Sequence, residues 1–274
     1  NAIGVIPPTG QVRYRVVLSA HLDTHRTPIF YSSKRWHTLF GFLVAGAFVS
    51  MVVGAVAYGL GAALDWPWVR WIGLIAAAIE VLALSLCLQA DFTPFSPGAN
   101  DDASGAGIIL AMAERLSQEP LVRTEVWLAL TGCEEGAAYG MAAFLDVHQA
   151  ELGDDAVYII LDQVGLGRLA YLTADGLIVK RKTHPRALEL VRQAKAALPD
   201  LEVDGHVGIA YTDAAVATKR GLIALTVDAL PPPGVEDVMH WHQMSDTLEH
   251  VDPQTLADAH AFTWQILRQI DQSQ

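Results

Sequence analysis

The chain has 274 residues, of which 52% are hydrophobic and only 18% are charged, whereas about a quarter of an ordinary soluble domain is charged. Acidic residues outnumber basic ones by 30 to 18, so the formal net charge is −12. This balance excludes a nucleic-acid binder, which needs a basic face against phosphates. So apolar a composition also excludes a disordered chain. Two cysteines, Cys87 and Cys133, are too few for a disulfide scaffold.

The first segment with a clear pattern is residues 11–20, which are β-branched and largely apolar and predict a strand that ends at His21. The chain begins without an initiator Met, directly on a strand-like segment. We therefore expect part of the natural N-terminus to be missing before residue 1.

Residues 36–90 hold most of the apolar excess. Two runs, each of about the length that spans a bilayer, are separated by a polar and aromatic break at 65–68, and the second run contains a single charge, Glu80. Tryptophans at the break and small residues at Gly46, Ser50 and Gly54 are typical of membrane helices. The block predicts a transmembrane helical hairpin with the lipid bilayer as its partner. The alternative is a pair of buried core helices.

The remaining segments alternate between strand and helix patterns. Strands are predicted at 124–131, 156–162 and 222–228, and helices at 104–116, 137–150, 184–197, 212–220 and 253–270. This alternation predicts an α/β fold, with a mainly parallel or mixed central sheet flanked by helices and the transmembrane-type hairpin inserted.

Polar residues collect where the predicted strands end, which is where α/β sheets bind ligands. They comprise His21-Leu22-Asp23, Glu134-Glu135 and Asp162, with Asn100-Asp101-Asp102 and His240-Trp241-His242 in loops. Each piece alone has an ordinary structural explanation, because an Asp pair can cap a helix and adjacent glutamates usually face solvent. Their order along the chain indicates a shared metal site.

Five segments, SAHLDT, SPGANDDASGAG, TGCEEGAAYG, LDQVG and WHQMSDT, occur in the order found in the co-catalytic di-zinc aminopeptidases. The chain resembles this family of zinc exopeptidases over about 220 residues outside the hydrophobic block. The resemblance implies two Zn²⁺ ions, one bound by His21 and Asp162 and the other by Glu135 and His242. Asp101 would bridge them and precede a cis peptide bond.

The resemblance also assigns two residues that are not ligands. Asp23 would hydrogen-bond His21 and fix its tautomer, and Glu134 would be the general base. The implied reaction is removal of N-terminal residues from peptides by a hydroxide shared between the two zincs. His and carboxylate ligands also accept Mn²⁺ or Co²⁺.

The motifs depart from the family in one position and leave other activities open. Trp241 stands where some relatives have a Tyr whose phenol stabilises the oxyanion; Tyr211 could replace it or simply pack under a loop. A carboxypeptidase or glutaminyl cyclase on the same fold is an alternative, and a carboxylate-binding pocket would need basic residues such as Arg168 or Lys180. A catalytically inactive peptidase-like membrane domain is the third possibility.

The hydrophobic block interrupts the peptidase-like sequence. We expect residues 1–35 and 91–274 to form the catalytic domain and residues 36–90 to form the inserted hairpin. Lys34 and Arg35 flank the first apolar run, whereas Asp65 and Arg70 lie at the far turn. The positive-inside rule then predicts a membrane protein whose catalytic domain lies in the cytoplasm.

Overall fold

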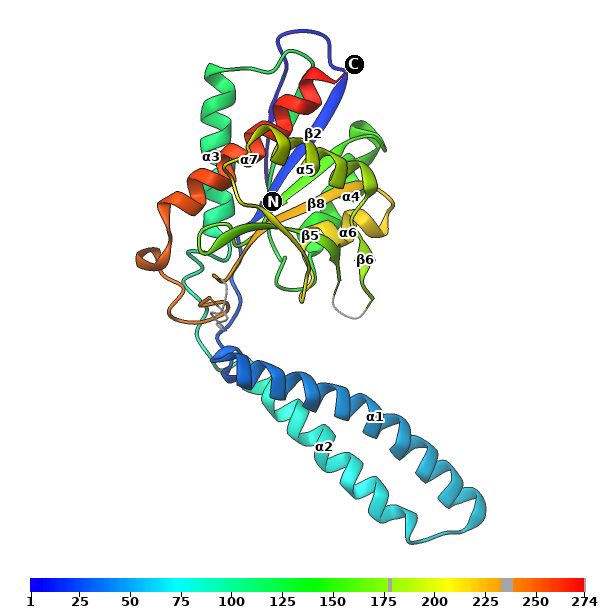
Figure 1. The fold of residues 1–274 in the computed structure, drawn as a ribbon. Coiled ribbons are helices and arrows are strands. Elements are labelled where there is room, and N and C mark those ends of the chain that lie inside the picture. The colour runs from blue at the N-terminus through cyan, green and yellow to red at the C-terminus, as the bar shows by residue number, and fades with distance from the viewer. Residues whose placement is uncertain (177–178, 233–238, 274) are drawn as a thin grey trace. The chain divides into compact units, whose positions relative to one another are not determined.

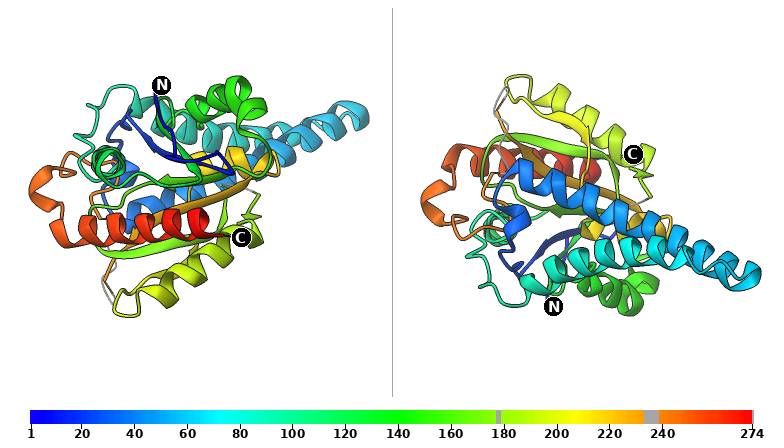
Figure 2. Two further views of the ribbon diagram at one scale, coloured as in Figure 1. Left: turned by 90° about the horizontal axis from the view of Figure 1, so that it is seen from above. Right: turned by 90° about the horizontal axis from the view of Figure 1, so that it is seen from below.

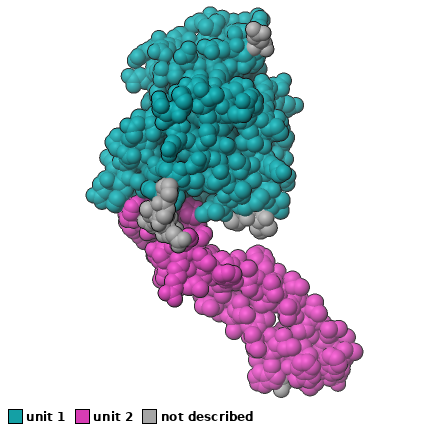
Figure 3. Space-filling model, viewed as in Figure 1, with its two compact units in different colours: residues 1–24, 97–235, 246–274 teal, residues 25–96, 236–245 magenta. Residues whose placement is uncertain are grey.

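The computed structural model describes residues 1–176, 179–232 and 239–273, apart from the side chain of Arg70. The chain divides into two compact units (Figure 3). The first unit comprises residues 1–24, 97–235 and 246–274, and the second comprises residues 25–96 and 236–245.

The first unit is built on a mixed eight-stranded sheet (Figure 1). Its strand order is β1-β3-β2-β4-β8-β5-β6, and β7 also pairs with β5. Strands β3, β2, β4 and β8 are parallel to one another. Strand β1 runs antiparallel to β3, and β5 runs antiparallel to β8 and β6 but parallel to β7. The strands are β1 (Ala2–Ile6), β2 (Tyr14–His21), β3 (Thr124–Thr131), β4 (Val157–Leu161), β5 (Arg168–Asp175), β6 (Arg181–Lys182), β7 (Asp204–Val207) and β8 (Ile223–Leu230).

Helices cover both faces of this sheet (Figure 2). Side chains alternate along a strand, so Val16 and Leu18 of β2 pack on one face and Val17 packs on the other. The first face is covered by α3 (Ala103–Gln118), α5 (Pro185–Ala197) and α7 (Pro253–Gln272). The second is covered by α4 (Tyr139–Leu152) and α6 (Asp213–Lys219). Short 3₁₀ helices lie at Ile29–Tyr31 and Leu248–His250.

The second unit contains the two long apolar helices α1 (Lys34–Leu64) and α2 (Val69–Ala90). The Ser33 side chain caps α1, and Asp65 ends it in the left-handed conformation with φ 51°. Gly54 lets the helices approach closely, because a Cβ on it would lie 3.2 Å from the Cβ of Ala76. Ser50 and Glu80 meet within this seam, with their side-chain oxygens 3.5 Å apart.

Both helices are long and apolar enough to cross a membrane, judged by length and composition. Their large side chains point outward: Phe42 is 73% exposed and Ile75 is 65% exposed. A soluble core helix would bury such residues. The helices therefore present an apolar surface that α1 and α2 do not bury against each other.

Candidate metal centre

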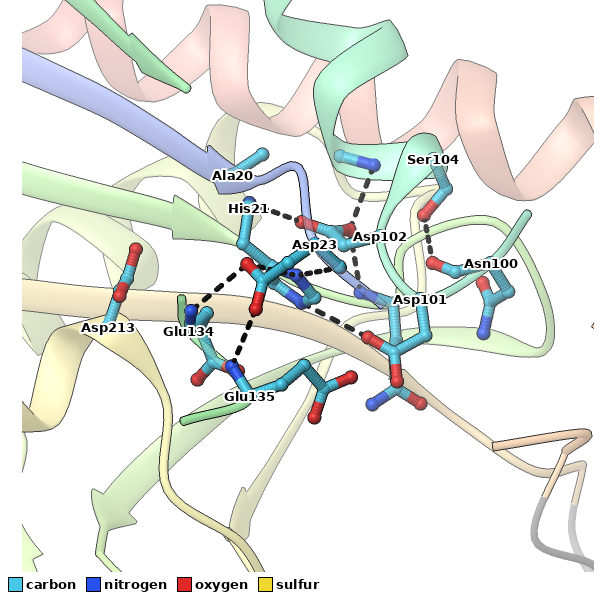
Figure 4. Close-up of polar contacts among 12 residues, drawn as sticks. Ala20, His21, Asp23, Asn100, Asp101, Asp102, Ser104, Glu134, Glu135 and Asp213 are labelled. Atoms are coloured by element: carbon cyan, nitrogen blue, oxygen red, sulfur yellow. Dashed lines mark hydrogen bonds and ion pairs between the residues drawn. The ribbon is translucent and has the colours of Figure 1, made fainter. Parts of the chain in front are cut away.

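Three predicted ligands gather at the carboxyl ends of neighbouring parallel strands. His21 is the last residue of β2, Asp162 directly follows β4, and Asp101 lies in the loop that leads into α3. One ligand atom from each of these buried residues lies within 4.8 Å of the other two. Nε2 of His21 is 3.1 Å from Oδ1 of Asp101 (Figure 4).

This donor set fits a zinc ion. Imidazole nitrogen and carboxylate oxygen are ordinary zinc ligands. Oδ1 of Asp162 is buried and has no hydrogen-bond partner among the described residues. Burying a carboxylate oxygen without a partner is costly unless a cation satisfies it. The pocket is therefore shaped and charged for a metal ion.

The electrostatics of the cluster lead to the same conclusion. Burial raises the pKa of Asp162 well above its usual value, and the charge of Asp102 adds to the effect. Burial alone would lower the pKa of His21, but its hydrogen bond with Asp101 and the surrounding carboxylates raise it well above 6.5. So many buried acids repel one another. A divalent cation would relieve this repulsion.

Backbone hydrogen bonds fix the loop that carries Asp101. The two carboxylate oxygens of Asp246 accept the N–H groups of Asn100 and Asp101, at 2.8 and 3.1 Å. The next carboxylate, Asp102, accepts the N–H groups of His21, Gly105 and Gln163. The Asp101–Asp102 peptide bond is cis, as the family resemblance predicted. Burial raises the pKa of Asp102 to about 8, although its backbone donors oppose the shift.

Asp23 has a different contact from the predicted one. We expected its carboxylate to hydrogen-bond His21, but the nearest carboxylate oxygen lies 3.9 Å from Nδ1 of His21. The backbone carbonyl of Asp23 lies 2.9 Å from Nδ1 instead. The carboxylate accepts the N–H groups of Glu134 and Glu135, at 3.0 and 3.2 Å (Figure 4). Asp23 therefore holds both the imidazole and the glutamate pair.

Glu134 lies in the loop between β3 and α4 and is buried in spite of its charge. Its Oε1 has no hydrogen-bond partner among the described residues. Burial raises the pKa of Glu134 well above its usual value, and the charge of Asp162 contributes. A carboxyl group of raised pKa beside a metal site is suited to accepting and releasing a proton near neutral pH.

His242 belongs to the second unit, and Glu135 is a half-buried residue of the first. Within the second unit, the His242 ring stacks on His25 with centroids 4.0 Å apart, and Tyr31 lies edge-on at 4.3 Å. Trp241 lies 4.9 Å from Tyr31. His25 and Tyr31 could not be singled out from the sequence, because both lie outside the recognised motifs. The ligand roles of Glu135 and His242 stay predictions.

The three residues considered above for binding a carboxylate or an oxyanion have partners within the chain. Arg168 forms an ion pair with Asp204, and Lys180 donates to the backbone carbonyls of Gly176 and Gly208. Tyr211 packs against the core cluster that includes residues of α4 and α6, and burial together with the charges of Asp175, Asp213 and Glu134 raises the pKa of its phenol. Both basic residues thus have partners within the chain.

Solved structures share this fold. A zinc aminopeptidase from Bacillus subtilis superposes with a TM-score of 0.62 and 17% identity, covering 99% of this chain and 51% of that one. A glutaminyl cyclase from an Acidobacteriales bacterium gives 0.60 and 17%, covering 98% of this chain and 73% of the other. The fold is that of the zinc exopeptidases.

The sequence model of peptidase family M28 matches residues 88–267, and the chain belongs to that family. Aminopeptidase YwaD of Bacillus subtilis is 38% identical over 27% of this chain and 16% of its own length. The probable lipoprotein aminopeptidase LpqL of Mycobacterium tuberculosis is 25% identical over 59% of this chain and 37% of its own length. The chain thus matches well under half the length of these two relatives.

Proposed function

We propose that this protein is a membrane-anchored, zinc-dependent aminopeptidase that removes N-terminal residues from peptides. The observation that carries the proposal is the buried cluster of His21, Asp101 and Asp162 beside the buried Glu134. Membership of family M28 and the aminopeptidase relatives support the same reaction.

His21 and Asp162 would hold one zinc, Glu135 and His242 would hold a second, and Asp101 would contribute to both. Bound zinc lowers the pKa of water and polarises a carbonyl group. Glu134 would accept the proton of the attacking water through Oε1 and later deliver it to the leaving amine. Asp23 would keep Glu134 in place through its backbone N–H.

A free amino terminus is the feature that would distinguish an aminopeptidase substrate at this centre. Bound zinc would offset much of the negative charge of Asp101 and Asp162, so the preference would rest on the free amine nitrogen, which in its deprotonated form can bind zinc. A substrate whose amino terminus is blocked lacks that amine. Preference for the unblocked amino terminus would make the enzyme an aminopeptidase.

The test is hydrolysis of aminoacyl p-nitroanilides by the full chain in detergent. We expect activity that a chelator removes and zinc restores, and no cleavage of N-acetylated substrates. A peptide with N-terminal Gln is included, because glutaminyl cyclases share the fold. Cyclisation without cleavage, preference for blocked peptides, or inactivity with two zincs bound would each reject the aminopeptidase.

Residues 36–90 would anchor the enzyme as a hairpin in the bilayer, while residues 1–35 and 91–274 form the catalytic domain in the cytoplasm. The exposed apolar surface of α1 and α2 supports the anchor, and Lys34 and Arg35 support the orientation. We expect the protein to stay in membranes through an alkaline carbonate wash. Added protease should digest the catalytic domain in inverted vesicles but spare it in right-side-out ones. The reverse pattern would overturn the orientation.

A further inference from the structure

The edge strand β1 brings Asn1 beside the loop that carries Glu134. It runs antiparallel to β3, with Ala2 opposite Leu130 and Ile6 opposite Val126. Its first residues therefore lie beside the carboxyl end of β3, where the chain leaves the sheet toward Glu134. Most of β1 is exposed, so the strand itself buries little apolar surface.

The side chain of Asn1 joins the two ends of the loop that carries Glu134. Its Oδ1 accepts the N–H of Gly132, at 3.0 Å, and its Nδ2 donates to the carbonyl of Gly140, at 2.8 Å. Gly132 follows β3 and Gly140 lies in the first turn of α4. A single side-chain amide thus links the two ends of the loop.

The two glycines are packed too closely for any other residue at position 140. A Cβ on Gly140 would lie 1.9 Å from the carbonyl oxygen of Gly132 and 2.9 Å from Oδ1 of Asn1. These contacts are to backbone atoms and to the short side chain that forms the bridge. The two ends of the loop therefore pack tightly against each other, and the Asn1 side chain links them as both a donor and an acceptor.

The loop between these glycines needs such support. Cys133, Ala137 and Ala138 all have positive φ, at 56°, 84° and 55°. Residues with a Cβ adopt this conformation only where the surrounding structure holds them there. Asp23 holds the middle of the loop through the N–H groups of Glu134 and Glu135, and Asn1 holds its ends.

We propose that Asn1 is a positioning residue for Glu134 and acts through Gly132 and Gly140. The inference rests on the proposed role of Glu134 as the base. When the Asn1 amide is lost, the two ends of the loop separate and the Glu134 carboxylate samples positions away from the attacking water. A displacement of about 1 Å at such a group can cost about 100-fold in rate.

The test compares Asn1→Ala, Asn1→Asp and wild type in the full chain. Asn1→Asp keeps an oxygen for Gly132 but cannot donate to Gly140, so its effect should be intermediate. Ile3→Thr is the matched control, because Ile3 lies on the same strand and is 41% exposed. For Asn1→Ala we expect kcat to fall between about 10- and 100-fold, with KM and zinc content unchanged.

Amide hydrogen exchange supplies a readout that does not depend on activity. Peptides that cover residues 132–140 should exchange faster in Asn1→Ala, while the rest of the chain and the Ile3→Thr control stay as in wild type. Gly140→Ala should speed exchange in the same loop by disturbing the contact from the other side.

Three results would overturn the inference. Unchanged exchange over residues 132–140 in Asn1→Ala would show that the side chain does not hold the loop. Faster exchange with unchanged kcat would show that the loop does not position the base. A zinc-loaded wild type that is inactive would reject the proposed function and with it a catalytic purpose for Asn1, while the exchange data would still show whether the loop is held.

Discussion

Nε2 of His21 lies 3.1 Å from Oδ1 of Asp101, although the two residues come from opposite sides of the apolar insert in the sequence. Both side chains are buried, so their charges interact more strongly than they would in water. Burial alone would lower the pKa of His21, but the hydrogen bond with Asp101 and the nearby carboxylates outweigh burial and raise that pKa, which favours the protonated imidazole when no metal ion is bound. Zinc requires the neutral imidazole, so metal binding replaces that proton.

Replacing His21 by Ala should abolish tight zinc binding at this cluster. The variant removes the nitrogen ligand and leaves Asp101 and Asp162 as buried like charges. We expect the zinc content, measured by elemental analysis after dialysis, to fall by at least one ion per chain. His184→Ala is the control, because His184 only accepts a hydrogen bond at the start of α5. Equal zinc in wild type and His21→Ala would remove His21 from the ligand set.

Glu134→Gln should separate metal binding from catalysis. Glutamine has the shape of glutamate but cannot accept the proton of the attacking water at neutral pH. Loss of a general base lowers rates by about 10²- to 10⁴-fold, so we expect kcat to fall in this range. Zinc content should equal that of wild type. A variant that retains most of its kcat would show that another group is the base.

Asp246→Asn tests the support of Asp101. One carboxylate oxygen becomes an amide that cannot accept the N–H of Asn100 or Asp101, so the loop should loosen. Loss of such a supporting contact typically costs 10- to 100-fold in metal affinity, which competition with a chelator would measure. Asp252→Asn is the matched control, because Asp252 caps α7 and Asn is an equally good cap. If both variants bind zinc equally, the Asp246 clamp does not determine affinity.

Gly54→Val should destabilise the hairpin. A Cβ at this position lies 3.2 Å from the Cβ of Ala76, and two further methyl groups have no room. Overpacking of this kind costs about 1–3 kcal/mol, which thermal melting of helical circular dichroism in detergent should register. A Cβ on Gly59 meets nothing within 4 Å, so Gly59→Val is the control. The hairpin seam would be wrongly assigned if Gly59→Val were the more harmful change.

The pair of His206 and Asp228 should make stability depend on pH. Nε2 of His206 lies 2.8 Å from Asp228. Burial lowers the pKa of His206, but the hydrogen bond and the charge of Asp228 outweigh it, so the pKa is raised. The stabilisation is thus complete below the unfolded value of about 6.5 and is lost as pH rises through the higher folded value.

Melting temperatures of wild type and His206→Gln between pH 6 and pH 9 would measure this contribution. The wild-type advantage should be largest at pH 6 and should shrink as pH rises. An advantage that grows with pH would show that the neutral imidazole is the stabilising form.

The regular elements were predictable because each contributes a distinct periodicity to the sequence. The strand predicted at 124–131 has the observed bounds. The helix predicted at 253–270 begins where predicted and ends two residues later, at Gln272. The strand predicted at 11–20 is observed as β2, Tyr14–His21. Strands β5, β6 and β7 were missed: β6 has only two residues, and β7, the sequence DGHV, lacks a strand pattern.

Site residues that belong to a sequence motif were predictable, whereas contacts between a side chain and backbone groups were not. His21 and Asp162, which follow strands, and Asp101, which lies in a loop, come together as the order of the motifs indicated. The contacts of Asp23 and Asp246 to backbone N–H groups leave no residue pattern, because any residue except Pro offers the donor. Asn1 was equally hidden, since its partners are two glycines remote in sequence.

The position of the apolar insert between His21 and Asp101 sets an order for synthesis. The ribosome makes the whole of α1 and α2 after the first ligand and before the second. A nascent chain therefore carries both apolar helices before it can hold a metal ion between these two side chains. Any metal-dependent activity of this centre would begin only on chains whose apolar helices have already been synthesised.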